Sequence, residues 1–432
     1  MLKNIKKIIF NTDRFLFKKF GSDKSVKSLE NIKEARIIFS SLNEMGAESV
    51  IRFVGGCVRK ALCGEEIDDI DLATSLIPEE VKEKLLKSGV KVIDTGISHG
   101  TLTAIVNNKK FEITTLRKDI ATDGRHAKVE FTKNWEEDAK RRDFTINAIY
   151  VDHEGRIFDP LNGILDLKSG RVKFIGSSVE RIQEDYLRIL RYVRFYIQYS
   201  KTEHDSEVIN NIKQNINGLN KISNERIFDE LNKILSLKKF NALFSKNEIR
   251  EIILKIFPQF QYYKRLSKFN KLGNKINNLY DISLILALLI IDETKEYEYF
   301  CYKYKLSKKI KDRLKNISDN FENLKNKKFY NKENIKKTIY LTSKNFVKDL
   351  LLFSKCIINK VDEQTIDALI DYSTNCKIPK FPISGDFLKE YGYETGEELG
   401  KKLKMLEQKW IENDFVIDKE KIKKSLEYRK LN

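Results

Sequence analysis

Short runs of hydrophobic residues, separated by polar breaks, occupy roughly the first 160 residues of the chain. Runs of this length that are rich in β-branched residues are typical of strands, whereas apolar residues spaced three and four apart predict helices. The predicted strands are Ser49–Val54, Ile70–Thr74, Val90–Asp94, Leu102–Val106, Phe111–Leu116 and Ala148–Val151. The predicted helices among them are Pro78–Lys87 and Trp135–Arg141.

The pattern changes after Pro160. From Ser178 onward the periods are long and helical and turn residues are few, with only five prolines in the whole chain. We therefore place a boundary near Asp159–Gly163. The expected division is a strand-containing domain over residues 1–160, a helical segment over 161–250 and a second helical segment over 251–432. The basic, mildly amphipathic stretch Met1–Phe20 predicts a short leading helix.

Composition narrows the class of protein. A chain of 432 residues is too long for one ordinary core, and 41% hydrophobic residues are enough to bury several. The net charge of +18 favours a polyanionic partner, although a lysine-rich composition inherited from an AT-rich genome would give the same excess. The five cysteines show no CxxC spacing, which fits a reducing cytoplasm. No apolar run is long enough to span a membrane, so no membrane partner is expected.

The strand that ends at Val54 is followed by two glycines and, shortly after, Arg59. Gly55 and Gly56 would let the backbone approach a phosphate closely, and Arg59 could pair with a triphosphate oxygen. About ten residues further along, Asp69 and Asp71 stand two apart, so on a strand both carboxylates share one face. Two carboxylates on one face form a site for Mg²⁺, and a pair of Mg²⁺ ions can activate a hydroxyl and stabilise a leaving pyrophosphate. Either motif alone is common, but their order and spacing together are rare.

Two later motifs carry further polar side chains. In the first, Arg142 offers a phosphate donor and Asp143 a hydroxyl acceptor, which suits one ribonucleotide, although a surface salt bridge is the alternative. The second, Glu184–Phe195, is predicted to be one helix, with an apolar ridge at Leu187, Leu190 and Val193 and a polar ridge at Asp185, Arg188, Arg191 and Arg194. Asp185 beside Arg188 presents an acceptor and a donor. This pattern complements the amino group and ring nitrogen of C and A and opposes G and U. Arg191 and Arg194 could then bind the triphosphate, and the alternative is a solvated face with ion pairs.

These motifs, in this order, resemble the class II tRNA nucleotidyltransferase and poly(A) polymerase family. The resemblance covers roughly residues 48 to 240. The segments that carry it are GGCVRKAL at Gly55–Leu62, DDIDLAT at Asp68–Thr74, DTGISHGTLT at Asp94–Thr103, FEITTLRKDIATDGRHAKVEF at Phe111–Phe131, EDAKRRDFTINAIYVD at Glu137–Asp152, DPLNGILDL at Asp159–Leu167, RIQEDYLRILRYVRF at Arg181–Phe195 and ISNERIFDELNKIL at Ile222–Leu235.

The resemblance implies an α+β fold: a polymerase-β-like nucleotidyltransferase head with a mixed β-sheet, followed by an all-helical neck, body and tail. It also implies two Mg²⁺ ions, the substrates CTP and ATP, and a tRNA 3′ end as the acceptor. By position, Asp69 and Asp71 match the metal ligands, and Gly56, Arg59 and Arg142 match nucleotide contacts. The neck positions Asp185, Arg188, Arg191 and Arg194 match the helix that reads base and phosphate. Asp123 and Arg125 fall in a loop that helps to switch addition from C to A, and Glu112 stands where a third acidic residue could support the metals.

One position departs from the family. The residue after Arg59 is usually Asp, and here it is Lys60, which removes a carboxylate that could orient the arginine and could instead add a phosphate contact. The expected function is the addition of C, C and A to tRNA. An enzyme that adds only CC, only A or a poly(A) tail remains an alternative, as does a non-catalytic RNA-binding protein on the same head. The oligomeric state is left open. The basic runs Lys308–Lys315 and Lys325–Lys337 are expected to contact the tRNA backbone.

Overall fold

The computed structural model describes residues 26–44, 48–122, 127–273, 281–357, 361–418, 420 and 422–423. The chain forms two compact units, Met1–Ile256 and Phe257–Asn432. The leading helix predicted for Met1–Phe20 lies outside the described residues, as do Asp123 and Arg125 of the predicted loop. The predicted three-part division remains a prediction.

A seven-stranded mixed sheet forms the centre of the first unit, in the order β3-β4-β5-β2-β1-β8-β9. Strand β2 runs parallel to β5 and antiparallel to β1, while β6 and β7 form a separate two-stranded ribbon. The strands are β1 Ile51–Val54, β2 Ile70–Thr74, β3 Lys91–Gly96, β4 Thr101–Val106, β5 Lys109–Thr115, β6 Arg117–Thr122, β7 Ala127–Phe131, β8 Tyr150–Val151 and β9 Ile157–Phe158.

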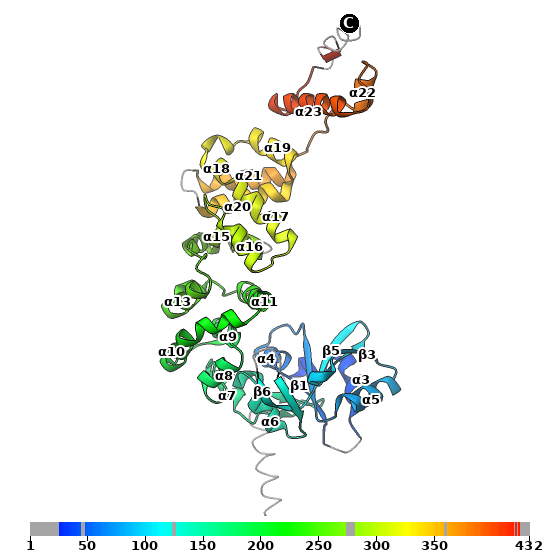
Figure 1. Cartoon of the computed structure of the whole chain (residues 1–432), viewed down its shortest axis with the longest axis vertical. Helices are drawn as coiled ribbons and strands as arrows, with labels where there is room; N and C mark the ends of the chain where they lie inside the picture. Colours follow the sequence, from blue (N-terminus) through cyan, green and yellow to red (C-terminus); the bar gives the residue numbers. More distant parts are fainter. Residues whose placement is uncertain are drawn as a thin grey trace, which may run out of the picture. The chain divides into compact units, whose positions relative to one another are not determined.

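At strands β2 and β5, one face of the sheet is covered and the other is more open. In β5, Phe111 and Ile113 are buried while Glu112 between them is exposed. The buried side chains of this face form one core with those of α3 and α5, which lie together against the sheet in Figure 1. Alternation with a period of two therefore places Glu112 and its neighbour Asp71 on the open face.

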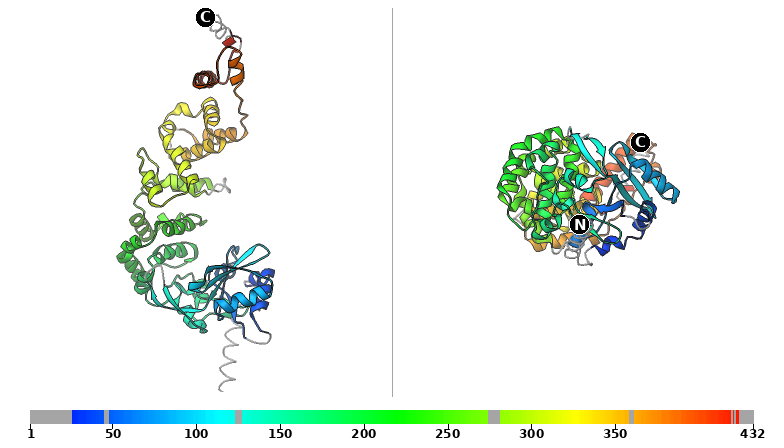
Figure 2. Two further views of the ribbon diagram at one scale, coloured as in Figure 1. Left: turned by 45° about the vertical axis from the view of Figure 1, so that its right-hand side comes forward. Right: turned by 90° about the horizontal axis from the view of Figure 1, so that it is seen from below.

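Outside the strands, the described residues are mostly helical, and the colours of Figures 1 and 2 follow these helices in chain order. In the first unit the helices are α2 Lys27–Glu30, α3 Lys33–Leu42, α4 Gly56–Cys63, α5 Pro78–Lys87, α6 Trp135–Arg141, α7 Gly163–Ser169, α8 Ser178–Glu184, α9 Arg188–Tyr199, α10 Ser206–Asn215, α11 Asn224–Leu235, α12 Ala242–Ser245 and α13 Asn247–Ile256. In the second unit they are α14 Leu266–Gly273, α15 Ile282–Ile290, α16 Glu296–Lys303, α17 Lys308–Asp319, α18 Phe321–Lys325, α19 Lys332–Leu341, α20 Lys344–Ile357, α21 Glu363–Asn375, α22 Gly385–Lys389 and α23 Glu397–Glu412. The predicted fold class, a mixed-sheet head followed by helices, is confirmed.

The predicted single helix Glu184–Phe195 is wrong. Helix α8 ends at Glu184 and α9 begins at Arg188, with Asp185 in an extended conformation between them (φ −151°, ψ 104°). The Asp185 Oδ1 atom accepts a hydrogen bond from the Leu187 amide at 3.1 Å. An aspartate that binds the backbone two residues ahead of it competes with the helix, which explains the break.

The predicted strand Ala148–Val151 is shorter than expected. A 3₁₀ turn at Thr145–Asn147 comes first, and its last hydrogen bond is donated by the amide of Ala148, so the strand β8 starts only at Tyr150. Strand β2 and helices α5 and α6 have their predicted bounds.

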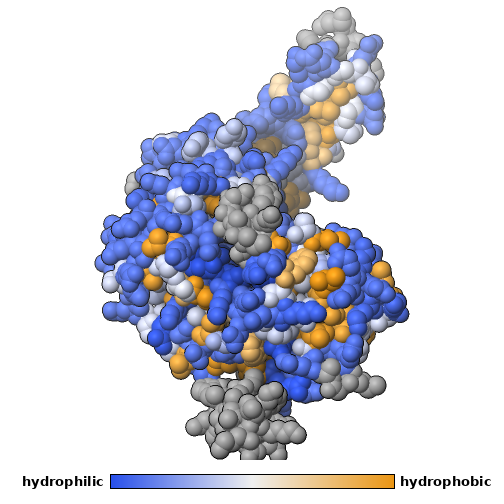
Figure 3. Space-filling model, turned by 60° about the horizontal axis from the view of Figure 1, so that its bottom comes forward, coloured by the Kyte–Doolittle hydropathy of each residue, from blue (hydrophilic) through white to orange (hydrophobic). Residues whose placement is uncertain are grey.

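Hydrophobic residues on the surface are scattered among hydrophilic ones over the face that Figure 3 turns to the viewer. The exposed ones in the first unit include Ile77, Leu86, Ile93 and Ile97. Among the described residues, no helix combines the length and the apolar character that crossing a membrane would require.

Candidate active site

The turn between β1 and α4 brings two functional side chains together. Gly55 has φ 73° and ψ −125°, a backbone conformation that favours glycine strongly. A Cβ atom at Gly55 would lie 3.7 Å from Asp71 Oδ2 and 3.8 Å from Arg142 Nη1. The predicted metal ligand and the predicted phosphate donor therefore approach the same glycine, although they are 71 positions apart in the chain.

Asp71 lies in β2 opposite Glu112 of β5, and its side chain is half-buried. Burial raises the pKa of Asp71 to about 6, and the negative charges of Glu112 and Asp69 add to the rise, while Arg142 and Arg59 oppose it. Asp69 is exposed and directly precedes the strand. Asp71 is thus a carboxylate whose ionised form is destabilised by its surroundings, and a bound cation would relieve this.

The residues fit a magnesium site completed by substrate. Among the parts of the chain that the structure describes, no group of three or more His, Cys, Asp or Glu side chains is arranged to hold a metal. Mg²⁺ commonly uses one or two carboxylates and takes its other ligands from water and substrate phosphates. Asp69 and Asp71 meet that requirement. The supporting role of Glu112 remains a prediction.

Lys60 forms an ion pair with Asp68, the residue directly before Asp69. The same Asp68 Oδ1 atom accepts a hydrogen bond from the Asp69 amide at 2.9 Å. The bond from Lys60 holds the pKa of Asp68 below its usual range. The structure therefore connects the unusual lysine to the loop that leads into β2 rather than to Arg59.

We expect Lys60→Met and Asp68→Asn each to lower the rate of nucleotide transfer, by up to about fivefold, because an exposed ion pair contributes no more than about 1 kcal/mol. The swapped pair Lys60→Asp/Asp68→Lys is expected to restore the rate. The measurement is kcat and KM for CTP with all three variants. A raised nucleotide KM in Lys60→Met alone, with no effect of Asp68→Asn and no rescue by the swap, would indicate a phosphate contact instead.

Arg59 is buried at the junction of the sheet domain and α9. It donates a hydrogen bond to Asn147, and its guanidinium carbon lies 4.6 Å from the ring centre of Phe195 and 5.2 Å from that of Tyr199. Its Nε atom has no hydrogen-bond partner among the described residues. Arg59 is thus held by Asn147 and two aromatic rings, and its binding of a phosphate remains a prediction.

Asp143 pairs with Arg191 of α9, with 2.5 Å between Oδ2 and Nη2. Burial acts to raise the pKa of Asp143, but the charge of Arg191 and the hydrogen bonds from Asn147 and Arg191 outweigh it and hold the pKa well below its usual range. Arg194 pairs with the buried Glu230 of α11, with 2.5 Å between Nε and Oε1. Asp143, the predicted ribose acceptor, and Arg191, a predicted phosphate donor, therefore bind each other in this structure.

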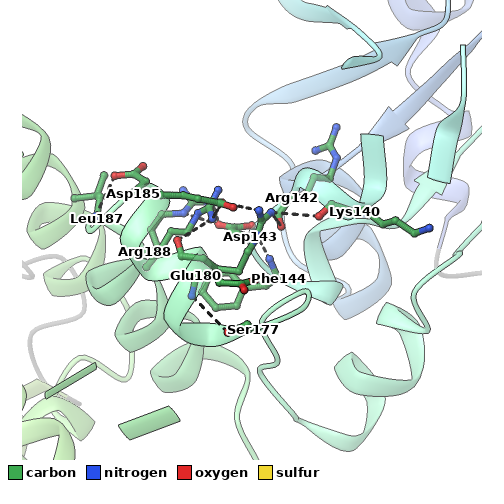
Figure 4. A network of polar contacts seen from close by, with 12 residues as sticks. Lys140, Arg142, Asp143, Phe144, Ser177, Glu180, Asp185, Leu187 and Arg188 are labelled. Carbon is green, nitrogen blue, oxygen red and sulfur yellow. Dashed lines mark hydrogen bonds and ion pairs between the residues drawn. The ribbon is translucent and has the colours of Figure 1, made fainter. Parts of the chain in front are cut away.

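Asp185 and Arg188 each contact a different residue of opposite charge. Asp185 Oδ2 lies 2.8 Å from Arg226 Nη2, and Arg188 Nη1 lies 2.6 Å from Glu184 Oε2. The backbone still connects the two predicted base-reading residues, since the Arg188 amide donates to the Asp185 carbonyl at 3.0 Å. Figure 4 shows Asp185 and Arg188 in one polar network with Arg142 and Asp143.

Sequence reasoning missed several residues that hold this site together. Asp138 and Tyr150 contact Arg142, and Glu184, Arg226 and Glu230 contact the base-reading segment. Two of these pairs had a signal in the sequence, because Asp138 stands four residues before Arg142 and Glu184 four residues before Arg188, which is the spacing of ion pairs on a helix. Long-range pairs such as Asp185 with Arg226 leave no local pattern.

Comparison with known proteins places the chain in a family. Residues 51–173 match the poly(A) polymerase head domain, and residues 204–263 match the probable RNA- and SrmB-binding site of polymerase A. The mouse mitochondrial CCA tRNA nucleotidyltransferase 1 is 33% identical over 95% of this chain and 93% of its own. The CCA-adding enzyme of Lactobacillus helveticus is 32% identical over 91% and 96% of the two chains.

Among solved structures, the Bacillus stearothermophilus CCA-adding enzyme in complex with CTP superposes with a TM-score of 0.69 at 24% identity, over 92% of this chain and 97% of its own. That likeness supports the fold. The sequence identity above 30% over nearly the whole chain shows that the protein belongs to the family of CCA-adding tRNA nucleotidyltransferases.

Proposed function

We propose that the protein is a nucleotidyltransferase that adds C, C and A, from CTP and ATP, to the 3′ end of tRNA without a nucleic-acid template. The observation that carries the proposal is the approach of Asp71 and Arg142 to the same turn at Gly55, in a chain that aligns with CCA tRNA nucleotidyltransferases over 95% of its length. A metal carboxylate and a phosphate donor at one glycine suit a bound triphosphate.

In this reaction each predicted site residue has a separate role. Asp69 and Asp71 would hold Mg²⁺, which supplies charge neutralisation at the phosphates and activation of the tRNA hydroxyl. Arg142 and Arg59 bind and orient the triphosphate. Asp185 and Arg188 select the base, and Arg191 and Arg194 reinforce the phosphate contacts.

Incubation with tRNA that lacks its last three nucleotides, with Mg²⁺, CTP and ATP, tests the proposal. We expect sequencing of the product 3′ ends to find CCA. Ends in CC alone, A alone or a run of A would indicate the alternative enzymes of the same family. No extension with any nucleotide, together with retained RNA binding, would favour the non-catalytic alternative.

The basic helix α17 is proposed to contact the tRNA backbone. Lys308, Lys309, Lys311 and Lys315 are exposed, and within the described residues none of them forms an ion pair. In the second basic run, Lys325 pairs with Glu293 and Glu322, and Lys337 pairs with Asp414. The other four lysines of the second run, Lys327, Lys328, Lys332 and Lys336, form no ion pair within the described residues, so both runs have positive charge to offer to RNA.

Replacing the four α17 lysines by Gln is expected to raise the KM for tRNA and to reduce the slope of log K against log salt by about one per lysine that contacts a phosphate. The KM for CTP should not change. The comparison variant is Lys325→Gln/Lys337→Gln, whose two lysines are already paired with carboxylates and which we therefore expect to have the smaller effect. Equal tRNA affinity and salt slope in wild type and the α17 variant would contradict the proposed contact.

The cellular location predicted from the cysteines, the cytoplasm, remains a prediction, and the mouse relative carries the word mitochondrial in its name. Fractionation of the source cells followed by immunoblotting would decide between the two.

A further inference from the structure

The guanidinium of Arg142 is held along one edge only. Its Nε donates to Asp138 Oδ2 at 3.2 Å and to the Tyr150 hydroxyl at 3.1 Å, and its Nη2 donates to Asp138 Oδ2 at 3.0 Å. Its Nη1 has no hydrogen bond to any residue in the described part of the chain, and it is the atom 3.8 Å from the Cβ position of Gly55. One edge is therefore fixed, and the other faces the turn that also adjoins Asp71.

Asp138 is a buried carboxylate that stays ionised and binds Arg142. Its side chain is 1% exposed, and its Oδ1 takes hydrogen bonds from Arg141 while its Oδ2 takes those from Arg142 and Tyr150. Burial acts to raise the pKa of Asp138, but the charges of Arg142 and Arg141 and the bond from Tyr150 outweigh it and hold the pKa well below its usual range. A buried carboxylate is tolerated when its oxygens are satisfied in this way.

Tyr150 connects Asp138 to the turn. It lies in β8 opposite Val54 of β1, the residue directly before Gly55. Its ring is fully buried and meets Trp135 edge to face at 5.4 Å. Burial raises the pKa of Tyr150 above its usual range, so the hydroxyl keeps its proton, donates it to Asp138 at 2.7 Å and accepts from Arg142.

We propose that Asp138 and Tyr150 are positioning residues that fix the Nε edge of Arg142 and thereby present its Nη1 to a phosphate oxygen of the incoming nucleotide beside Asp71. The inference rests on the proposed function. It adds the two residues that orient Arg142, and it predicts that their loss weakens nucleotide binding rather than the reaction step. A network that serves only stability would lower the melting temperature and leave the nucleotide KM unchanged.

The decisive variant is Tyr150→Phe, which removes one oxygen and keeps the ring against Trp135. We expect the KM for both CTP and ATP to rise about fivefold, with kcat and the KM for tRNA changing less than twofold. The Kd of CTP measured by calorimetry should rise by the same factor. The control is Tyr196→Phe, another buried tyrosine of the first unit, whose hydroxyl binds the Thr202 carbonyl at 3.1 Å. It removes a comparable hydrogen bond without touching Arg142, and it should leave the nucleotide KM unchanged.

Coupling with Arg142 gives the second test. Lysine has a single ammonium group and cannot make the paired hydrogen bonds that Arg142 makes to Asp138 and Tyr150. In an Arg142→Lys background, Tyr150→Phe should therefore cause no further rise in nucleotide KM. Asp138→Asn is expected to raise the KM more than Tyr150→Phe does. An unchanged CTP Kd in Tyr150→Phe, or full additivity with Arg142→Lys, would overturn the inference. Failure of the wild type to extend tRNA in the same assay would instead count against the proposed function, and the CTP Kd would still test the role of Tyr150.

Discussion

Replacement of Asp71 by Asn is expected to abolish transfer of both C and A and, at the same time, to stabilise the metal-free protein at neutral pH. Loss of activity follows because the variant removes a charged ligand from a site that must hold Mg²⁺ among several phosphate charges. The gain in stability follows because burial, Glu112 and Asp69 raise the pKa of Asp71 from 3.8 to about 6. The folded state therefore disfavours the ionised carboxylate of Asp71. Asparagine resembles the neutral carboxylic acid and carries no charge, so it avoids this cost.

The difference in the free energy of unfolding between wild type and Asp71→Asn depends on pH. Below about pH 4 Asp71 is protonated in both the folded and the unfolded state, so wild type and Asp71→Asn should differ little. Between about pH 4 and pH 6 the unfolded state loses the proton first, and above pH 6 the variant should be more stable by up to about 3 kcal/mol, at about 1.4 kcal/mol for each unit by which the folded and unfolded pKa values differ. Urea denaturation in the presence of a chelator measures this.

The control for Asp71→Asn is Glu83→Gln, an exposed carboxylate of α5 paired with Lys87. It should keep full transfer activity and show no comparable stabilisation. Near-wild-type transfer by Asp71→Asn, or by Asp69→Ala, would remove these residues from the metal site. A metal-free Asp71→Asn that is less stable than wild type at pH 7.5 would contradict the electrostatic account of the site.

Asp185→Ala is expected to change which nucleotide is added rather than only how fast. In the proposed role the carboxylate would accept from the amino group of C and A, a charge-assisted bond of about 1.5–3 kcal/mol, and would repel the carbonyl of U and G. Removing it weakens the correct pairs and relieves the wrong ones. Discrimination should therefore fall by about one to two orders of magnitude per contact. The measurement is kcat/KM for all four nucleotides.

The ion pairs in the structure sharpen this test. Asp185 contacts Arg226, and Arg188 contacts Glu184. To read a base, each of these two side chains would have to bind the nucleotide in addition to its present partner or in place of it. The matched control is Asp229→Ala, an exposed carboxylate on α11, which should leave the nucleotide ratios unchanged. If Asp185→Ala and Arg188→Ala lower all four rates by the same factor, the two residues serve the structure of the neck and base selection lies elsewhere.

Local patterns along the chain were enough to predict the fold class and the family of this protein. The alternation in Ile70–Thr74, the apolar spacing in Pro78–Lys87 and the glycine pair after Val54 are local signals, because each depends on neighbours in the chain. The motif order that carries the family resemblance is likewise a linear property. The fold class and the family were therefore within reach of the residues alone.

The contacts that hold the predicted site residues in place became visible only in the folded chain. A local reading predicted one helix through Glu184–Phe195, but the side chain of Asp185 binds the backbone of Leu187 and breaks it. Pairing across the sheet placed Tyr150 beside Val54, and the buried Asp138 gathered Arg142 next to the turn that faces Asp71. The bond from Asp185 to Leu187 and the spacing of Asp138 and Arg142 are local, but which of the possible local contacts forms depends on the surrounding fold. The pairing of Tyr150 with Val54 and the approach of Arg142 to Asp71 join residues far apart in the chain, and no period or spacing in the sequence encodes them.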